Sequence, residues 1–148
     1  MMIICGMTRS ELIRFVQRQR LGVVSSLATD GAPQSAVVGI ATSESGEIVF
    51  DTLGTSRKAG NLRRDRRVSL VVWENERTVQ LDGLADEPTG GELDRLREVY
   101  FAVYPDGRER LTWPGLTHFR LVPAWGRFSD FEASPEPLIV ELDLAPGR

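Results

Sequence analysis

The chain is poor in cysteine and histidine, and each scarcity excludes a class of site. Among its 148 residues the one cysteine, Cys5, excludes an internal disulfide and a cysteine-rich metal site. The one histidine, His118, leaves no material for a His/Cys zinc site or a Cys–His nucleophile. A lone histidine in a strand is more often a packing or surface residue than a ligand. Strand alternation predicts that it shares the polar face with Arg120.

Long apolar runs and the common catalytic motifs are also missing. No run approaches the roughly 20 apolar residues that a membrane-spanning helix needs. The sequence has no Gly-x-Gly-x-x-Gly fingerprint, no Walker pattern and no Gly-x-Ser-x-Gly elbow, so no dinucleotide fold or serine hydrolase is indicated. Any chemistry is therefore expected to come from a bound cofactor. Four aromatic residues suit a planar ring, although each is more often a packing residue: Trp73, Trp113, Trp125 and Phe128.

What is present is the composition of one globular domain, with 41% hydrophobic and 26% charged residues. We expect residues 8–148 to form this domain and residues 1–7 to be a flexible extension, with Met7 as an alternative start. A net charge of −3 argues against general nucleic-acid binding. The single cysteine fits a reducing cytoplasm, which is the expected location.

The periodicity predicts a mainly β chain with flanking helices. Capping boxes that start at Thr8 and Thr89 open two helices, the first over residues 9–20 and the second stopped by Pro105. A short helix is predicted over residues 57–64. Short strands with tight turns favour an antiparallel sheet or barrel over a doubly wound βαβ fold. The predicted strands cover residues 21–28, 34–42, 47–52, 67–73, 78–85, 117–122 and 138–142.

The segment from Asp51 to Leu62 carries the most information about function. A strand end leads into a loop rich in Gly, Thr and Ser, and a helix begins at Ser56-Arg57-Lys58. The start of a helix has unpaired backbone N–H groups and the positive end of the helix dipole, so it favours an anion. Arg57 adds a planar fork for two phosphate oxygens, and Lys58 adds a point charge. The pattern therefore predicts a phosphate site.

The alternative interpretation is a solvated basic helix with Ser56 as an ordinary N-cap. Basic residues in a first helical turn oppose the helix dipole, which favours the phosphate interpretation. Lys58 is also the only lysine among 18 basic residues. Six bases stand against one acid, Asp65, between Ser56 and Arg67, which suggests a local anion. These bases are Arg57, Lys58, Arg63, Arg64, Arg66 and Arg67.

The same segment resembles the pyridoxamine 5′-phosphate oxidase-like flavoproteins. The likeness extends to the hairpin over residues 21–40 and to a late strand over residues 120–123 followed by Phe128, so it covers most of residues 8–131. The resemblance implies an antiparallel split β-barrel, FMN as cofactor, and a homodimer with two flavin sites at the interface. The residues that carry it are Ile48-Val49-Phe50-Asp51-Thr52, Ser56-Arg57-Lys58-Ala59 and Arg67-Val68-Ser69-Leu70.

The resemblance also implies which residues bind the flavin. In such proteins the residues that match Ser56, Arg57 and Lys58 hold the phosphate, and the match to Thr52 helps to hold the ribityl phosphate. The strand that matches residues 35–38 runs along the isoalloxazine with its backbone. The partner subunit completes the site, and the region of Trp125 and Arg127 is expected to do so. The expected cofactor-binding residues are Ser35, Ala36, Val37, Val38, Thr52, Ser56, Arg57, Lys58, Trp125 and Arg127.

Two elements of the true pyridoxamine phosphate oxidases are missing. Their C-terminal Arg-x-His, which grips the substrate phosphate, has no counterpart, because after Phe128 the next arginine is Arg148 and no histidine follows. The arginine of the first flavin strand is absent as well, with Gln34 and Ser35 nearby. The resemblance therefore implies an FMN-dependent oxidoreductase with an unassigned small-molecule substrate.

Three alternatives stay open at this point. A deazaflavin-dependent reductase of the same fold would bind a longer acidic tail, for which Arg63, Arg64 and Arg66 are candidates. The chain could also be a flavin-binding or sensing dimer without turnover, or a barrel that has lost its cofactor. No catalytic residue is assigned, and no metal, nucleic-acid or membrane partner is expected.

Overall fold

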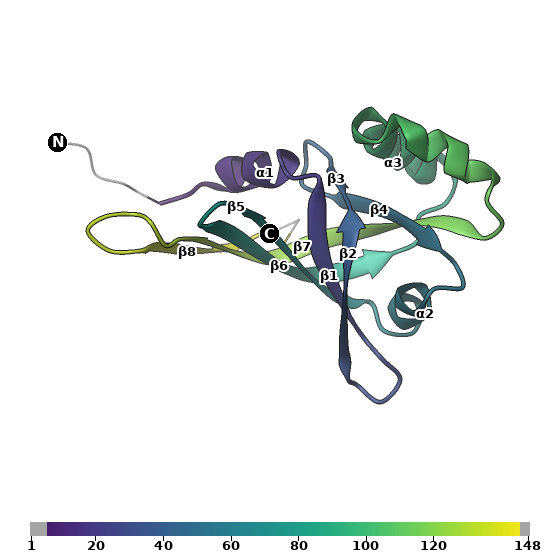
Figure 1. The fold of residues 1–148 in the computed structure, drawn as a ribbon, viewed down its shortest axis with the longest axis horizontal. Helices are drawn as coiled ribbons and strands as arrows, with labels where there is room; N and C mark the ends of the chain where they lie inside the picture. Colours follow the sequence, from purple (N-terminus) through teal and green to yellow (C-terminus); the bar gives the residue numbers. More distant parts are fainter. Residues whose placement is uncertain (1–5, 146–148) are drawn as a thin grey trace.

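The computed structural model describes residues 6–145, which form one antiparallel sheet flanked by helices (Figure 1). Of the expected extension over residues 1–7, residues 1–5 lie outside the described part. The prediction of a mainly β chain with flanking helices is confirmed. The elements are α1 (Arg9–Gln17), β1 (Leu21–Leu27), β2 (Pro33–Gly39), β3 (Ala41–Thr42), β4 (Ile48–Leu53), α2 (Arg57–Arg64), β5 (Arg67–Glu74), β6 (Arg77–Asp86), α3 (Gly90–Val103), the 3-10 segment η1 (Pro105–Thr112), β7 (Leu116–Asp130) and β8 (Leu138–Asp143).

The sheet curls into a half-barrel around the long strand β7. Its strand order is β2-β1-β5-β6-β7-β4-β3, with β8 paired to β7 as well. β7 pairs with β6 along most of its length, with β4 along its first part and with β8 along its last part. The pairing of β1 with β5 stops at Ser25 and Ser69, so the end of the β1–β2 hairpin leaves the sheet. α2 packs against β1 near this point.

The helix boundaries follow the predicted caps with two differences. At α1 the capping box is complete, because the Thr8 hydroxyl accepts from the Glu11 backbone and the Glu11 carboxylate accepts from the Thr8 backbone. The helix ends at Gln17, three residues before the expected end. The prediction of a second capping box was wrong, since the Thr89 side chain makes no capping hydrogen bond. The bounds of α2 agree with the prediction.

Two strand predictions need correction, and both errors come from long-range pairing. The strand expected over residues 34–42 is two strands, because the chain changes partner at Ile40: β2 pairs with β1, and β3 pairs with β4. The strand expected to end at residue 122 continues to Asp130. Pro123, which has no N–H, lies at a bulge where the β6–β7 register shifts next to Gly83, so the ladder resumes beyond the proline.

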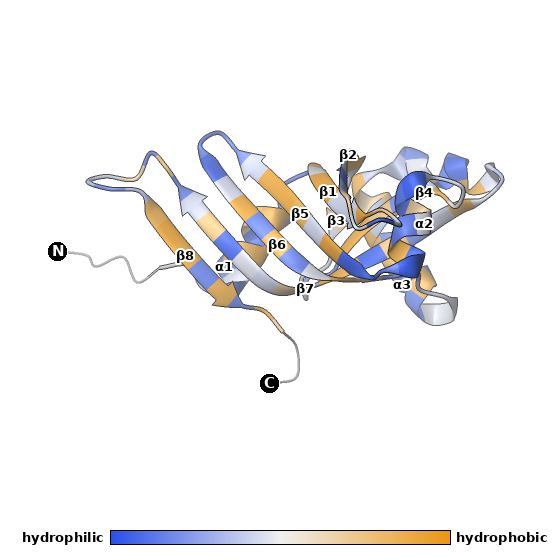
Figure 2. Cartoon of the chain, turned by 90° about the horizontal axis from the view of Figure 1, so that it is seen from below, coloured by the Kyte–Doolittle hydropathy of each residue, from blue (hydrophilic) through white to orange (hydrophobic). Residues whose placement is uncertain are grey.

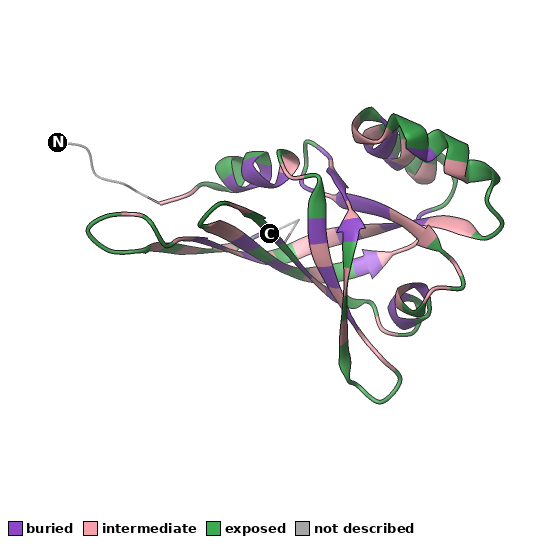
Figure 3. Cartoon of the chain, viewed as in Figure 1, coloured by how far each residue is buried: buried purple, intermediate pink, exposed green. Residues whose placement is uncertain are grey.

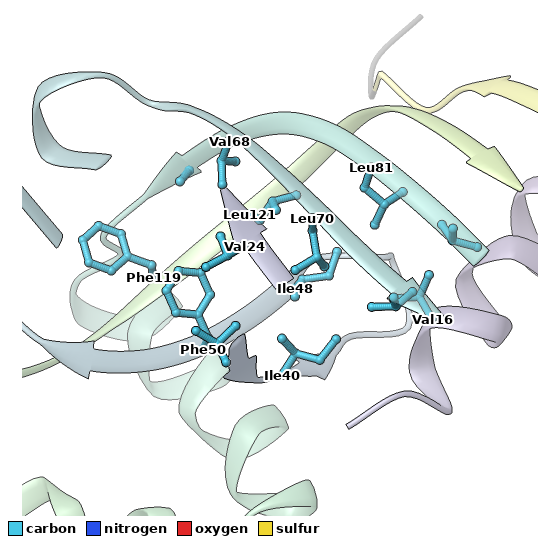
Figure 4. Close-up of a cluster of buried hydrophobic side chains, with 14 of the residues drawn as sticks. Val16, Val24, Ile40, Ile48, Phe50, Val68, Leu70, Leu81, Phe119 and Leu121 are labelled. Atoms are coloured by element: carbon cyan, nitrogen blue, oxygen red, sulfur yellow. The ribbon is translucent and has the colours of Figure 1, made fainter. Parts of the chain in front are cut away.

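The core lies inside the half-barrel, under α1 and α2. Phe50 from β4 and Phe119 from β7 stack there with ring centroids 5.9 Å apart, and Val24 lies near them (Figure 4). A second cluster packs α3 against β3 and β4, and Figure 3 shows buried residues along one face of that helix. No helix within residues 6–145 is both long and apolar enough to cross a bilayer.

Candidate functional site

The start of α2 is held by hydroxyl groups from the preceding strand and loop. Ser56 is the N-cap, and its Oγ accepts from the backbone N–H of Ala59 at 3.2 Å. The Thr52 hydroxyl, at the end of β4, donates to the same Oγ at 2.9 Å. Because these two donors use both lone pairs of Ser56 Oγ, its own hydrogen is left to donate to a third group. The predicted link between strand end and helix start is thus a direct hydrogen bond.

The basic cluster around α2 divides into bases that bind protein groups and bases that do not. Arg63 donates to both carboxylate oxygens of Glu87, at 2.8 and 2.7 Å. Arg64 and Arg66 donate to backbone carbonyls, and Arg67 pairs with Asp65. The side chains of Arg57 and Lys58 make no hydrogen bond or ion pair with any residue of the described range 6–145. Two adjacent cations are therefore free at the start of the helix.

These two cations line a hollow between α2 and the β1–β2 hairpin. The hollow has a volume of about 130 Å³. That volume is below the roughly 300–1,000 Å³ of typical ligand pockets, so it suits one part of a ligand such as a phosphate. A second hollow of about 350 Å³ opens where β1 parts from β5, and Ser26 lines both. The residues that line the first hollow are Val24, Ser26, Gln34, Ser35, Ala36, Arg57, Lys58 and Asn61.

A buried amide forms the floor of the first hollow. Asn61, on α2, is 4% exposed, and its Nδ2 donates to Ser26 Oγ at 3.0 Å and to Gln34 Oε1 at 2.8 Å. Ser26 and Gln34 are direct partners across the β1–β2 ladder. The Asn61 Oδ1 accepts from Arg64 at 3.1 Å. This network fixes α2 against both strands of the hairpin.

The sequence prediction missed Asn61, Gln34 and Ser26 as site residues. One signal was available, because Asn61 lies beside Leu62 on a helix face that packs inward with Ala59. A second was Ser26, a polar residue at an inward position of a strand whose preceding inward residue is Val24. The contacts themselves join residues 27 and 35 positions apart.

The strand expected to run along a flavin ring, residues 35–38, belongs to β2 at one edge of the sheet. Every second residue of an edge strand turns its N–H and C=O away from the neighbouring strand, so these groups are open to a ligand or a second chain. Ser35 and Ala36 line the hollow, while Val38 is buried. Val37 points to the other face of the sheet and is 64% exposed.

Trp125 and Arg127 do not reach the hollow within one chain. They lie on β7, which is separated from β1 by β5 and β6. Their cross-strand partners are Asp82 and Gln80 of β6, and the Trp125 Nε1 donates to Glu141 of β8 at 3.3 Å. They lie on the outer side of the sheet, away from the core. Hydrophobic and hydrophilic residues alternate along β5 and β6 (Figure 2), because successive residues of a strand point to opposite faces.

That outer side carries exposed apolar side chains in a row across three strands. Val37, Val23 and Val71 are successive cross-strand partners on β2, β1 and β5. Val71 is 36% exposed, and Trp73, two residues further along β5, is 44% exposed.

His118 lies away from the hollow, buried under α3. It is 1% exposed, and the Tyr100 and Phe101 rings meet it edge to face at 5.4 and 6.0 Å. Burial lowers the pKa of its imidazole to about 4. Asp51, opposite it on β4, binds Tyr100 and Arg110 instead, at 3.1 and 2.8 Å. The sequence left a packing and a surface role open for this histidine, and the structure shows the packing role.

The described residues offer no metal site. No group of three or more His, Cys, Asp or Glu side chains within residues 6–145 is placed to hold a metal ion.

Comparisons with known proteins agree with this architecture. A family model described as pyridoxamine 5′-phosphate oxidase matches residues 9–129. No curated protein matches the chain in sequence. A heme binding protein from Mycobacterium smegmatis has a TM-score of 0.80 and 19% identity, covering 95% of this chain. The present chain spans only 60% of that protein's length.

Two further solved structures match over similar shares of this chain and of their own length. A conserved hypothetical protein from Mycobacterium tuberculosis has 27% identity and a TM-score of 0.73 over 85% of this chain and 86% of its own. A pyridoxamine 5′-phosphate oxidase-related, FMN binding protein from Nostoc punctiforme has 11% identity and a TM-score of 0.64 over 90% and 91%. These similarities confirm the antiparallel split β-barrel. Since the family model matches most of the residues that build this barrel, the chain belongs to the pyridoxamine 5′-phosphate oxidase family.

Proposed function

We propose that this chain is an FMN-binding flavoprotein that acts as an oxidoreductase on a small-molecule substrate. The observation that carries the proposal is a pair of cations, Arg57 and Lys58, at a hollow next to a helix start. Neither side chain has a partner among residues 6–145. Neighbouring bases are bound to protein groups, so these two are available for a ligand anion. FMN bound there would supply electron or hydride transfer, and the protein would hold and orient it.

The donors at the hollow and at the adjoining start of α2 fit a phosphate. Ser56 has one hydrogen left to donate, and the backbone N–H groups of the first turn point out of the helix. Arg57 and Lys58 add charge-assisted hydrogen bonds, which contribute roughly 1.5–3 kcal/mol each. Such a site would bind the phosphate of FMN more tightly than it binds riboflavin, which has no phosphate.

We propose that a second copy of the chain completes the site. The hollow at Lys58 is too small for a whole flavin, and the adjoining edge of β2 is open. The exposed row that contains Val37 and Val71 gives a second copy an apolar surface. Trp125 and Arg127 lie on the same outer side, so pairing through this side would bring them toward the flavin of the partner.

The substrate is not expected to be pyridoxamine phosphate. The end of β7 and the following turn carry Asp130 and Glu132, which would repel a second phosphate. The proposed substrate is therefore a small molecule without a phosphate group at that position.

Titration of the purified protein with FMN tests the cofactor proposal. Lys58→Ala should weaken FMN binding roughly 10- to 100-fold, because it removes one charge-assisted hydrogen bond. Arg66→Ala is the matched control: it removes the same charge nearby, but Arg66 donates to the Ala85 carbonyl at 2.9 Å. Equal FMN affinity in wild type and Lys58→Ala would refute the assigned site.

Parallel titrations separate the other ligands. Deazaflavin binding would require Arg63, Arg64 and Arg66 to leave their protein partners. Heme ligation by histidine would require exposure of His118, which is buried. Tighter binding of a deazaflavin cofactor or of hemin than of FMN would overturn the FMN proposal.

Two further measurements test the dimer and the redox role. Val71→Arg should convert a dimer to a monomer in sedimentation and lower FMN affinity in parallel. Anaerobic addition of NADH or NADPH to the flavin-loaded protein should bleach its visible absorbance, with reoxidation by an added dye. A loaded protein that no donor reduces would support a flavin-binding or sensing role without turnover.

A further inference from the structure

A chain of side-chain hydrogen bonds leads from Arg64 to the hollow and has only one possible polarity. An arginine can only donate, so the Asn61 atom 3.1 Å from Arg64 must be the amide oxygen. The other end of the Asn61 amide is then the NH₂ group, which donates to Ser26 and Gln34. Which end of an amide side chain is the oxygen and which is the nitrogen is often ambiguous. Here the Arg64 guanidinium, at one end of the series of hydrogen bonds, settles it for Asn61.

The orientation of Asn61 fixes the orientation of Gln34 in turn. Because Gln34 accepts through Oε1 at 2.8 Å, its Nε2 group is the free end of the side chain. That NH₂ group makes no hydrogen bond with any residue of the range 6–145, and Gln34 lines the hollow beside Lys58. Ser26 Oγ likewise accepts from Asn61, which leaves the Ser26 hydrogen to donate.

We propose that Gln34 is a ligand-binding residue that donates its Nε2–H to a hydrogen-bond acceptor of the bound cofactor, and that Asn61 is the positioning residue that fixes this donor. The inference rests on the proposed flavin site and deepens it. Four side chains that line the hollow would then present a donor, namely Ser26, Gln34, Arg57 and Lys58. The site would select the acceptor-rich edge of a ligand and reject a donor at the same place, since two facing donors leave both groups unpaired.

The substitution Asn61→Asp reverses the polarity and leaves Gln34 and the two cations in place. Both aspartate oxygens accept, so Arg64 keeps its partner while Ser26 and Gln34 must turn to donate toward residue 61. Gln34 would then present Oε1 to the hollow. The variant retains the same number of internal hydrogen bonds, so the fold is expected to persist, which circular dichroism and thermal melting check.

A double-mutant cycle on FMN affinity separates this reversal from the added negative charge. Asn61→Asp should weaken FMN binding roughly 10-fold or more, and Gln34→Met, which removes the donor without charge, should weaken it roughly 5- to 10-fold. In the Gln34→Met background, Asn61→Asp should cost much less than it does in the wild type. An undiminished cost in that background would mean that charge alone acts, and would overturn the proposal.

Nuclear magnetic resonance of the ligand-free protein gives an independent readout of the amide orientation. The side-chain NH₂ of Asn61 should exchange slowly with water, because it is buried and bonded twice, while that of Gln34 should exchange fast. On FMN addition only the Gln34 NH₂ should become protected. A Gln34 NH₂ that is already protected without ligand would overturn the inference.

Lys58→Ala distinguishes failure of this inference from failure of the flavin site. If Lys58→Ala weakens FMN binding while the cycle shows no coupling, the flavin site stands and the role of Gln34 and Asn61 is wrong. If the wild type binds no FMN, both proposals are wrong.

Discussion

The buried His118 should make the free energy of unfolding depend on pH, and the size of this effect follows from the burial of its imidazole. The imidazole is 1% exposed, and neither ring nitrogen has a hydrogen-bond partner within residues 6–145. Burial lowers its pKa from 6.5 to about 4; the Asp51 carboxylate opposes the shift, while Arg97 and Arg110 add to it. The ring is therefore neutral in the folded protein at neutral pH.

The sign and window of the pH dependence follow from linkage. Between about pH 4 and pH 6.5 the unfolded chain binds a proton at His118 and the folded chain does not, so stability falls as pH falls through this window. Each pKa unit corresponds to 1.36 kcal/mol, so the gap amounts to about 3 kcal/mol. Below pH 4 the imidazole is protonated in both the folded and the unfolded state, so the loss of stability is complete.

Replacement of His118 by phenylalanine should abolish this dependence. Phenylalanine keeps the edge-to-face contacts with Tyr100 and Phe101 and removes two buried nitrogens that lack partners. Urea unfolding at fixed protein concentration, from pH 7.5 to pH 4, gives the free energy of unfolding for both proteins. The variant should gain about 3 kcal/mol relative to wild type on going from pH 7.5 to pH 4.

Two results would refute this reasoning. One is a stability difference between wild type and His118→Phe that is the same at pH 7.5 and pH 4.5. The other is a titration midpoint near pH 6.5 for the imidazole proton resonance, which is unambiguous because the chain has one histidine.

Three other substitutions test the fold around the site. Gly83→Ala should destabilise by roughly 3 kcal/mol or more in urea unfolding, since a Cβ there would lie 2.1 Å from the backbone oxygen of Val122; a loss below 1 kcal/mol would contradict that close approach. Glu47→Gln should lower the free energy of unfolding at pH 7 by about 1–2 kcal/mol and make it depend less on pH below pH 4.5. The reason is that the hydrogen bond from Arg95, above all, lowers the pKa of Glu47 to about 2. An unchanged pH dependence below pH 4.5 would count against this reasoning. Thr8→Ala should cost about 1 kcal/mol in thermal unfolding through loss of the N-cap of α1, with a null effect speaking against the capping box.

The local elements, including the strand end and helix start that carry the candidate anion site, could be predicted from the sequence. Alternation and turn residues gave most strand positions, and the bounds of α2 agree because Ser56 is a local cap and Ala59 and Leu62 form a local apolar face. The most specific part of the family resemblance is the same short segment. Such signals lie within about one helical turn or one strand, so a linear reading can detect them.

The strand partners could not be predicted, and two errors follow from that. Nothing local at Ile40 marks the change from β1 to β4 as neighbour. Pro123 indicates a strand end to a linear reading, whereas the bulge opposite Gly83 lets β7 continue. Pairing is decided by the register of distant strands, which the backbone conformation of one segment does not encode.

The sequence by itself determined that a basic Ser-Arg-Lys segment follows a strand and opens a helix. Only the tertiary structure decided which of its bases are free, because Glu87, Leu27 and Ala85 come from other parts of the chain to bind the rest. The structure likewise placed Asn61 between two strands. The sequence shows which residue could donate to a ligand. Whether that donor is free depends on burial and on partners from distant parts of the chain, which only the tertiary structure shows.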